Sequence, residues 1–94
     1  MDHPVTRRLI ATFEGRVQGV GFRWTAARAA RQAGVVGWVR NELDGSVHLV
    51  AEGRAEQLEQ LLHLVRAGME GHITRERLEE TPATGEFATF EIAP

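Results

Sequence analysis

Hydrophobic and polar positions alternate in several stretches of this chain, and the alternation predicts strands. Residues 7–16 alternate, with Leu9, Ala11 and Phe13 on one side of a predicted strand. This strand ends at a glycine-rich stretch. Residues 87–92 alternate again and predict the last strand of the chain.

The middle of the chain predicts an antiparallel hairpin. Residues 35–41 and 47–52 are rich in valine and are separated by a short polar turn. Asp44-Gly45 lies in this turn, and the pair favours hairpins because both residues tolerate positive φ angles. Further on, residues 73–80 have few apolar positions among charged ones, which is typical of a solvent-facing edge strand, and residues 81–85 form a turn cluster.

Helical spacing of the apolar residues occurs twice. Residues 22–34 are rich in alanine, and Gly34 is suited to end this helix because glycine readily takes the left-handed conformation found at helix C-termini. Residues 55–67 carry a leucine and valine stripe at positions i, i+3, i+4 and i+7. Gly68 and Gly71 are expected to end this second helix.

The predicted order is strand, helix, strand, strand, helix, strand, with one more strand at the C-terminal end. This order usually gives an α+β fold, the ferredoxin-like βαββαβ sandwich, in which two helices cover one face of a mostly antiparallel sheet, here with five strands. Because the chain has 94 residues and no linker, we expect a single domain over residues 1–94.

Composition excludes several classes of function. The chain has no cysteine, and its four histidines lack the spacing of metal ligands, so we expect no metal and no cofactor. The sequence shows no signal peptide and no apolar run that could span a membrane, which makes the cytoplasm the expected location. A net charge of −2 argues against a broad nucleic-acid-binding surface.

The glycine-rich stretch of residues 15–23 is the first candidate for a functional site. Three glycines join a predicted strand to a predicted helix, where the backbone can turn tightly and approach a ligand. Backbone N–H groups in such a loop and the positive end of the following helix suit an anion, and Arg23 adds a guanidinium group that can bind phosphate or carboxylate. A turn that only joins the two elements, with Arg23 in solvent, is the alternative.

Two nucleotide-binding motifs that share these glycines are absent. The Walker motif requires a lysine, and this chain has none, because all eleven of its Lys and Arg residues are arginines. The dinucleotide motif fails because Trp24 stands where its third glycine is required. The expected ligand is therefore a small anion.

Asn41 is the second candidate because of its place in the predicted topology. Strands joined by a helical crossover run parallel, so residues 7–16 and 35–41 should end at the same edge of the sheet. Asn41 would then face the glycine-rich loop, where its amide could orient a water against a bound anion. Support of the strand end or of an Asx turn is the alternative. Trp24 could wall the site, although packing is the simpler interpretation for it and for Trp38.

The segments just described resemble the acylphosphatase family. The resemblance rests on Gly-Arg-Val-Gln-Gly-Val-Gly-Phe-Arg at residues 15–23, on Gly-Trp-Val-Arg-Asn at residues 37–41 and on Asp-Gly-Ser-Val at residues 44–47. Glu-Gly at 52–53 and the C-terminal residues 85–92 also fit, so the resemblance covers nearly the whole chain. Glu76 and Glu80 depart from the pattern, because apolar or aromatic residues are expected there.

The resemblance implies an enzyme that hydrolyses the carboxyl–phosphate bond of small acyl phosphates to carboxylate and orthophosphate without a metal. By position, Arg23 and the loop amides would hold the phosphoryl oxygens, and Asn41 would position the attacking water. The implied phosphate-binding loop residues are Gln18, Gly19, Val20, Gly21, Phe22 and Arg23. Inorganic phosphate is the expected product and competitive inhibitor, and we expect a monomer without nucleic-acid or membrane partners.

A non-catalytic ferredoxin-like module that binds a small anion or a partner protein is the main alternative. RNA binding on the sheet is disfavoured, because residues 47–52 offer no aromatic side chain on which a base could stack. Hydrolysis of an acyl phosphate by the purified protein distinguishes the enzyme from the binding module.

Overall fold

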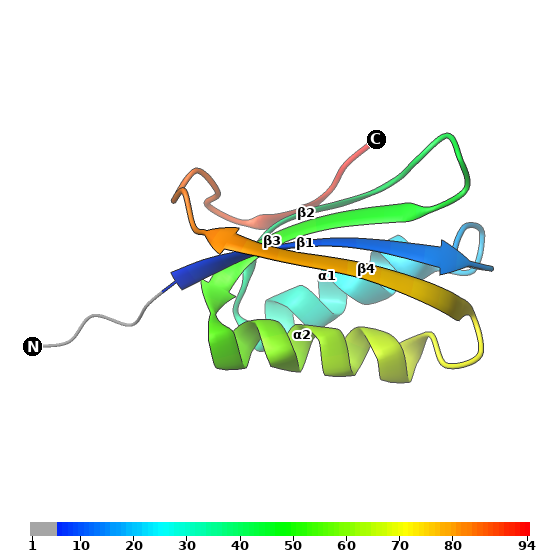
Figure 1. Cartoon of the computed structure of the whole chain (residues 1–94), viewed down its shortest axis with the longest axis horizontal. Helices are drawn as coiled ribbons and strands as arrows, with labels where there is room; N and C mark the ends of the chain where they lie inside the picture. Colours follow the sequence, from blue (N-terminus) through cyan, green and yellow to red (C-terminus); the bar gives the residue numbers. More distant parts are fainter. Residues whose placement is uncertain (1–5) are drawn as a thin grey trace, which may run out of the picture.

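A five-stranded sheet with both helices on one face forms the described part of the chain, residues 6–94 of a computed structural model (Figure 1). The expected single domain also includes residues 1–5, which lie outside the described residues. The elements follow the predicted order: β1 (Thr6–Gly15), α1 (Phe22–Ala33), β2 (Val36–Asn41), β3 (Val47–Arg54), α2 (Ala55–Gly68), β4 (Ile73–Pro82) and β5 (Phe90–Ile92).

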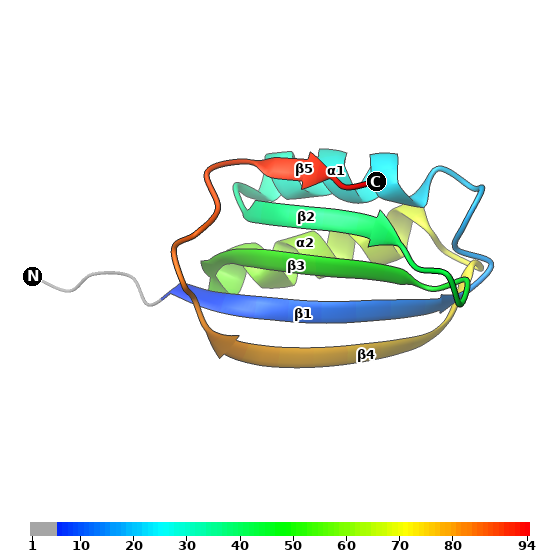
Figure 2. The same ribbon diagram turned by 90° about the horizontal axis from the view of Figure 1, so that it is seen from above.

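The strands are arranged in the order β4-β1-β3-β2-β5 (Figure 2). Neighbouring strands are antiparallel except for β2 and β5, which are parallel. The predicted α+β ferredoxin-like sandwich with an added strand is therefore confirmed. Among residues 6–94, no helix is long and apolar enough to cross a membrane.

The hydrophobic core lies between the helices and the sheet. Leu9, Ala11 and Phe13 of β1 are buried, so the side singled out by the alternation is the core side. The ring of Phe22, at the start of α1, packs against Phe13 with 5.1 Å between the ring centroids. The buried apolar residues of the two helices are Phe22, Ala26, Ala27, Ala29 and Ala30 in α1 and Leu58, Leu61 and Val65 in α2.

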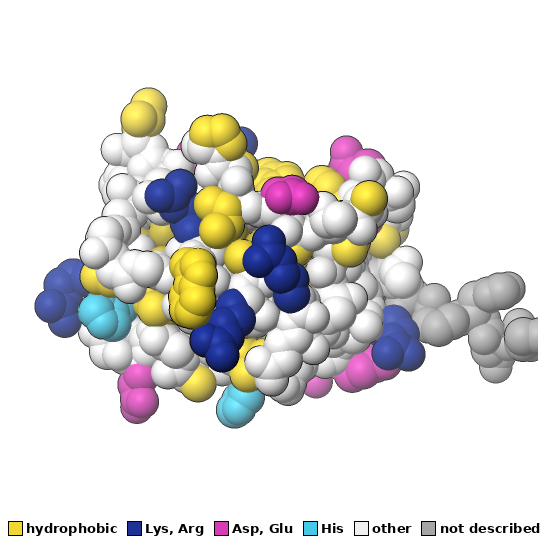
Figure 3. Space-filling model, turned by 180° about the vertical axis from the view of Figure 1, so that it is seen from behind, with side chains coloured by type: hydrophobic (Ala, Val, Ile, Leu, Met, Phe, Trp, Pro, Cys, Tyr) yellow, Lys and Arg dark blue, Asp and Glu magenta, His cyan; other side chains and the backbone are white. Residues whose placement is uncertain are grey.

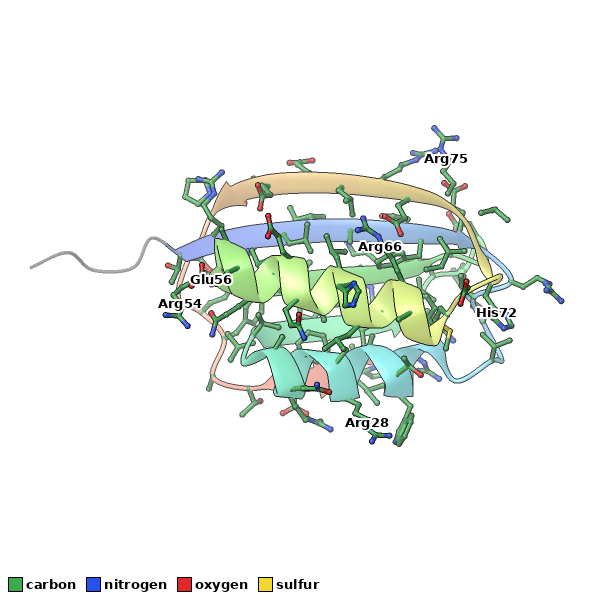
Figure 4. The ribbon with its side chains drawn as sticks, turned by 90° about the horizontal axis from the view of Figure 1, so that it is seen from below. Arg28, Arg54, Glu56, Arg66, His72 and Arg75 are labelled. Carbon is green, nitrogen blue, oxygen red and sulfur yellow. The ribbon has the colours of Figure 1, made fainter. Side chains whose placement is uncertain are left out.

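The edge strand β4 pairs with β1 over its whole length and carries a charged residue on its helix side. Glu76 lies opposite the buried Phe13, where an apolar residue was expected. Arg66 of α2 reaches this carboxylate and donates hydrogen bonds of 2.6 to 3.1 Å to it (Figure 4). The helix thus supplies the partner that lets a glutamate occupy this position. Glu80, opposite Leu9, is exposed.

The last strand is shorter than predicted, because β5 covers only Phe90–Ile92 and not the three residues before it. The preceding segment is held by the buried carboxylate of Glu52, at the end of β3. This carboxylate accepts the backbone N–H groups of Thr84 at 2.9 Å and Gly85 at 3.0 Å, and the Nε of Arg8 at 2.7 Å. We call these four residues the Glu52 clamp. These two bonds hold residues 84 and 85 outside the sheet, ahead of β5. The other boundaries lie within two residues of those predicted.

Candidate functional site

The C-terminal ends of β1 and β2 lie at the same edge of the sheet, as the topology predicted. Both strands are antiparallel to β3, which lies between them, and Phe13, Val47 and Asn41 share one row across the three strands. Residues 16–21 leave β1 at this edge and lead into α1 (Figure 2). The glycine-rich loop and Asn41 are therefore neighbours in space.

An open cavity of about 210 Å³ lies where the loop, the start of α1, the end of β2 and the end of β5 meet. It is smaller than the roughly 300–1,000 Å³ of most small-molecule sites, which suits a small anion. The residues that line it are Val17, Gly19, Gly21, Phe22, Arg23, Trp24, Asn41 and Ile92. Arg23 and Asn41, the two side chains singled out from the sequence, thus line one cavity. Gln18 and Val20 do not line it.

The loop backbone is shaped by two glycines in the left-handed region, Gly19 with φ 76° and Gly21 with φ 79°. Side chains are strained in this conformation. Gly21 is also the N-cap of α1, and no side chain caps the helix there. As a result, the backbone N–H groups of residues 18–24 donate to no acceptor within residues 6–94. These donors and the positive end of α1 are available to an anion.

The start of the loop is held against the turn that precedes β4. The Arg16 N–H donates to the carbonyl oxygen of His72 at 2.9 Å (Figure 4 labels His72). Gly15 has φ 128°, and a Cβ atom there would lie only 2.3 Å from the same oxygen. Glycine is therefore required at the point where the chain leaves β1.

The side chain of Gln18 ties the loop to the turn between β2 and β3. Its Nε2 donates to the carbonyl oxygens of Glu42 at 2.7 Å and Ser46 at 2.9 Å. The same turn is closed by the Glu42 N–H, which donates to Ser46 O at 2.9 Å. Because Glu42 follows Asn41 directly, these bonds fix the loop relative to the Asn41 amide. Sequence reasoning gave Gln18 only a backbone role and missed this one.

In its alternative interpretation, Asn41 was expected to support an Asx turn, but another residue makes that turn. Asp44 accepts the Ser46 N–H at 2.9 Å and the Ser46 hydroxyl at 2.6 Å, so Asp44 makes the Asx turn. These bonds lower the pKa of the Asp44 carboxyl. The half-exposed Asn41 side chain instead lines the cavity.

The segment that carries Arg23 and Asn41 is rich in positive charge. Residues 15–41 contain five arginines and no acidic residue, although the whole chain has a net charge of −2. Arg23 forms no ion pair with a carboxylate of residues 6–94, whereas Arg40 pairs with Glu42 at 2.6 Å. On the face that carries α1 and β5, arginine side chains lie beside hydrophobic ones (Figure 3). A local excess of positive charge attracts an anionic ligand.

The cavity lining suits an anion better than a cation. A guanidinium group, backbone amides, a carboxamide and apolar side chains surround the space, and no acidic residue or histidine is part of its lining. Elsewhere in residues 6–94, no group of three or more His, Cys, Asp or Glu side chains is arranged to hold a metal ion.

Two apolar residues, Trp24 and Ile92, also line the cavity. The sequence indicated Trp24 only weakly and Ile92 not at all. Trp24 is 62% exposed and lines the cavity, so the simpler interpretation of a packed tryptophan is wrong. Ile92 comes from β5, which pairs with β2 in parallel and brings Ile92 beside Val39. Only the adjacency of Trp24 to Arg23 in the sequence could have indicated either residue.

Comparison with known proteins gives one consistent family. The acylphosphatase family model matches residues 9–92. The acylphosphatase of Cupriavidus pinatubonensis is 45% identical over 84 residues, which cover 88% of this chain and 91% of that protein. The acylphosphatase of Methylococcus capsulatus is 45% identical over 87 residues, covering 92% of this chain and 95% of that protein.

Solved structures give the same result for the fold. The crystal structure of acylphosphatase from Bacillus subtilis superposes with a TM-score of 0.87 at 30% identity, covering 94% of this chain and 99% of that one. Full-length HypF, in its phosphate- and nucleotide-bound form, matches with a TM-score of 0.81 at 20% identity over 99% of this chain and 12% of its own. The second likeness shows the shared fold alone.

Proposed function

This chain belongs to the acylphosphatase family and is an enzyme that hydrolyses acyl phosphates, and from this premise we propose how its site carries out the reaction. Arg23 and the loop N–H groups bind the phosphoryl group, and Asn41 orients the water that attacks it. The observation that supports this proposal is that both side chains line the same cavity, next to unpaired loop donors. Membership of an enzyme family decides against the non-catalytic module.

Phosphoryl binding follows from the donors around the cavity. The planar guanidinium of Arg23 can bond two phosphoryl oxygens at once, and it has no competing carboxylate partner in residues 6–94. The loop N–H groups and the positive end of α1 add donors that are already oriented. Charge spreads over the equatorial oxygens in the transition state, so fixed donors stabilise the transition state more than the ground state.

The water is the second reactant, and its orientation is the proposed role of Asn41. The water oxygen bonds to phosphorus while the bond from phosphorus to the carboxyl oxygen breaks, and the carboxylate leaves with the electron pair. One proton of the water passes to a phosphoryl oxygen, so the products are carboxylate and orthophosphate. A carboxylate is a good leaving group, so catalysis can rest on positioning and on charge stabilisation without a strong acid.

We propose that the reaction needs no metal ion, since Arg23 and the loop donors supply the positive field that a metal supplies in other phosphoryl-transfer enzymes. The cavity lining offers amides, a guanidinium and apolar groups, which are poor ligands for a hard cation. Hydrolysis of acetyl phosphate at full rate in excess chelator is expected. Abolition of activity by the chelator, restored by a divalent cation, would contradict the metal-free reaction.

Two substitutions test the assigned residues. Arg23→Lys is expected to weaken inhibition by inorganic phosphate and to lower turnover, because an ammonium group cannot make the bidentate contact. Arg16→Lys is the matched control, since Arg16 lies in the same loop but does not line the cavity, and it should behave as wild type. Wild-type kinetics in Arg23→Lys would remove Arg23 from the site.

Asn41→Ala is expected to lower kcat on the order of a hundredfold with little change in the inhibition constant of phosphate, as for loss of one oriented donor in a preorganised site. Gln32→Ala removes an exposed amide from α1 and serves as the control. If kcat is unchanged in Asn41→Ala, the water-positioning role is refuted.

A further inference from the structure

One face of the sheet is open. Both helices of residues 6–94 lie on the other face, and Figure 2 looks onto the open one. A row of four residues crosses the open face, one from each of β4, β1, β3 and β2: Arg77, Thr12, His48 and Arg40. Thr12 follows the buried Ala11 in β1, so the row points away from the core. We call these four residues the open-face row.

Two adjoining cavities lie over the open-face row, one of about 330 Å³ and one of about 280 Å³. Three residues of the row line both cavities, which therefore form one groove. The first cavity extends to the β2–β3 turn, where Glu42 and Asp44 line it. The second extends over the apolar side chains of Ile10 and Leu78, and Glu79 also lines it. The groove is therefore large enough for a small molecule that has a charged end and an apolar end.

Charges of opposite sign line the first cavity without contacting each other. Hydrogen bonds from Ser46 lower the pKa of the Asp44 carboxyl, and the positive charge of Arg77 lowers it further. Arg77 nevertheless forms its ion pair with Glu14, at 3.4 Å, and none with Asp44. The guanidinium and the carboxylate thus act on each other across a gap. A ligand that carries both charges can fill this gap and bind to each of them.

Both side chains keep hydrogen-bonding capacity for such a ligand. Ser46 donates its N–H and its hydroxyl to Oδ1 of Asp44, so Oδ2 is left to accept from a ligand. Glu14 Oε2 accepts no hydrogen bond within residues 6–94, so the N–H donors of the Arg77 guanidinium are not used there. The Thr12 hydroxyl, which lines both cavities, adds a further polar group to the groove.

We propose that the open-face groove binds an apolar α-amino acid in its zwitterionic form. The carboxylate of the amino acid accepts hydrogen bonds from Arg77, and its ammonium group donates to Asp44. Its side chain packs against Ile10 and Leu78 in the second cavity. A simple anion would be repelled by the two carboxylates of the turn, and a simple cation by the two arginines of the row, so a ligand with both charges matches the lining best.

The test titrates the purified protein with leucine in a calorimeter. Saturating inorganic phosphate is present to occupy the phosphoryl cavity of Arg23 and Asn41, which shares no lining residue with the groove. Leucine is expected to bind. Leucinamide lacks the carboxylate, N-acetyl-leucine lacks the ammonium group and alanine lacks the large side chain, so each should bind at least about tenfold more weakly. Equal affinity for any of the three, or no binding of leucine, would overturn the proposal.

Arg77→Gln should weaken leucine binding at least about tenfold, because it removes the partner of the carboxylate. Arg75→Gln is the matched control, since both side chains are 64% exposed and lie near Glu14, but Arg75 lines neither cavity (Figure 4 labels Arg75). It should bind leucine as the wild type does. An equal loss of affinity in the two variants would show a general effect of surface charge and would refute the assigned groove.

Asp44→Asn keeps an oxygen for the Ser46 hydrogen bonds but removes the charge, so it should also weaken leucine binding at least about tenfold. Glu59→Gln, at an exposed position of α2, is its control. In NMR spectra leucine should shift the ring signals of His48, which lines both cavities, and not those of His63 on α2. Shifts at His63 without shifts at His48 would contradict the site. Melting temperatures report the folding of each variant separately.

Discussion

Replacing Glu52 by glutamine removes one charge from the Glu52 clamp and changes its shape little. The side chain is only 4% exposed. Burial alone would raise the pKa of this carboxyl, but the hydrogen bonds from the Thr84 and Gly85 N–H groups and from Arg8 outweigh burial and lower the pKa from 4.5 to about 2. Glutamine has an NH₂ group in place of one acceptor oxygen, so it cannot accept all of these donors.

The size of the effect follows from the lowered pKa. A pKa that falls from 4.5 to about 2 on folding corresponds to roughly 3 kcal/mol of stabilisation at neutral pH. Because the folded protein holds the proton less tightly than the unfolded chain, this contribution is complete above about pH 5 and is lost as the pH falls towards 2. Loss of about 3 kcal/mol in a domain of this size lowers the melting temperature by about 10 °C or more.

Urea unfolding of the wild type and Glu52→Gln between pH 7 and pH 3 measures this contribution. At pH 7 the variant is expected to be less stable by about 3 kcal/mol, and the gap should narrow below pH 5 because only the wild type titrates at this position. The Glu52 clamp lies where β1 begins and β3 ends, and the phosphoryl cavity lies at the opposite edge of the sheet (Figure 2). The kcat of the folded variant should therefore be unchanged.

Glu86→Gln is the matched control, because Glu86 also binds Arg8 but its side chain is 56% exposed. The hydrogen bond from Arg8 lowers the pKa of Glu86, but solvent screens an exposed pair, so its loss should cost much less stability than Glu52→Gln. Equal stability of the wild type and Glu52→Gln at pH 7, or a gap that stays constant down to pH 3, would refute the reasoning.

Two further predictions concern the loop. Gln18→Ala removes both hydrogen bonds from the loop to the β2–β3 turn. It is expected to lower kcat/KM by at least about tenfold in steady-state kinetics, with only a small fall in melting temperature. A wild-type value of kcat/KM would show that these two bonds do not position the site. Gly21→Ala, at φ 79°, should cost about 1 kcal/mol in urea unfolding and also weaken inhibition by phosphate. Gly85→Ala, at φ 76° in the segment that Glu52 holds at the opposite end of the sheet, should cost stability alone. Equal inhibition constants of phosphate in the wild type and Gly21→Ala would contradict a role of the Gly21 backbone.

Local pattern predicted most of the fold because the relevant forces act over short distances in sequence. The alternation of Leu9, Ala11 and Phe13 identifies the core side of β1, since side chains on one face of a strand recur at every second residue. Gly34 ends α1 with φ 80°, in the left-handed conformation that glycine favours. The prediction that Arg23 and Asn41 share one site followed from the topology, because parallel strands end at one edge of a sheet.

Contacts between distant residues could not be predicted in the same way. The sequence indicates that Gln18 is polar but not that the Glu42 and Ser46 carbonyl groups will be within reach of its amide. The path of the segment before β5 depends on which acceptor the N–H groups of residues 84 and 85 bind, and the buried Glu52 provides it. Such partners are set by tertiary packing, which a pattern of single residues does not contain.

The parallel pairing of β5 with β2 has a practical consequence for fusion proteins. Ile92 is a wall of the cavity, and Pro94 lies two residues beyond it along the chain. A purification tag or fused domain attached after Pro94 therefore begins beside the mouth of the site and competes with the substrate for that space. Thr6 begins β1 at the other end of the sheet (Figure 1), so the start of β1 is the end of the described chain that lies farther from the cavity.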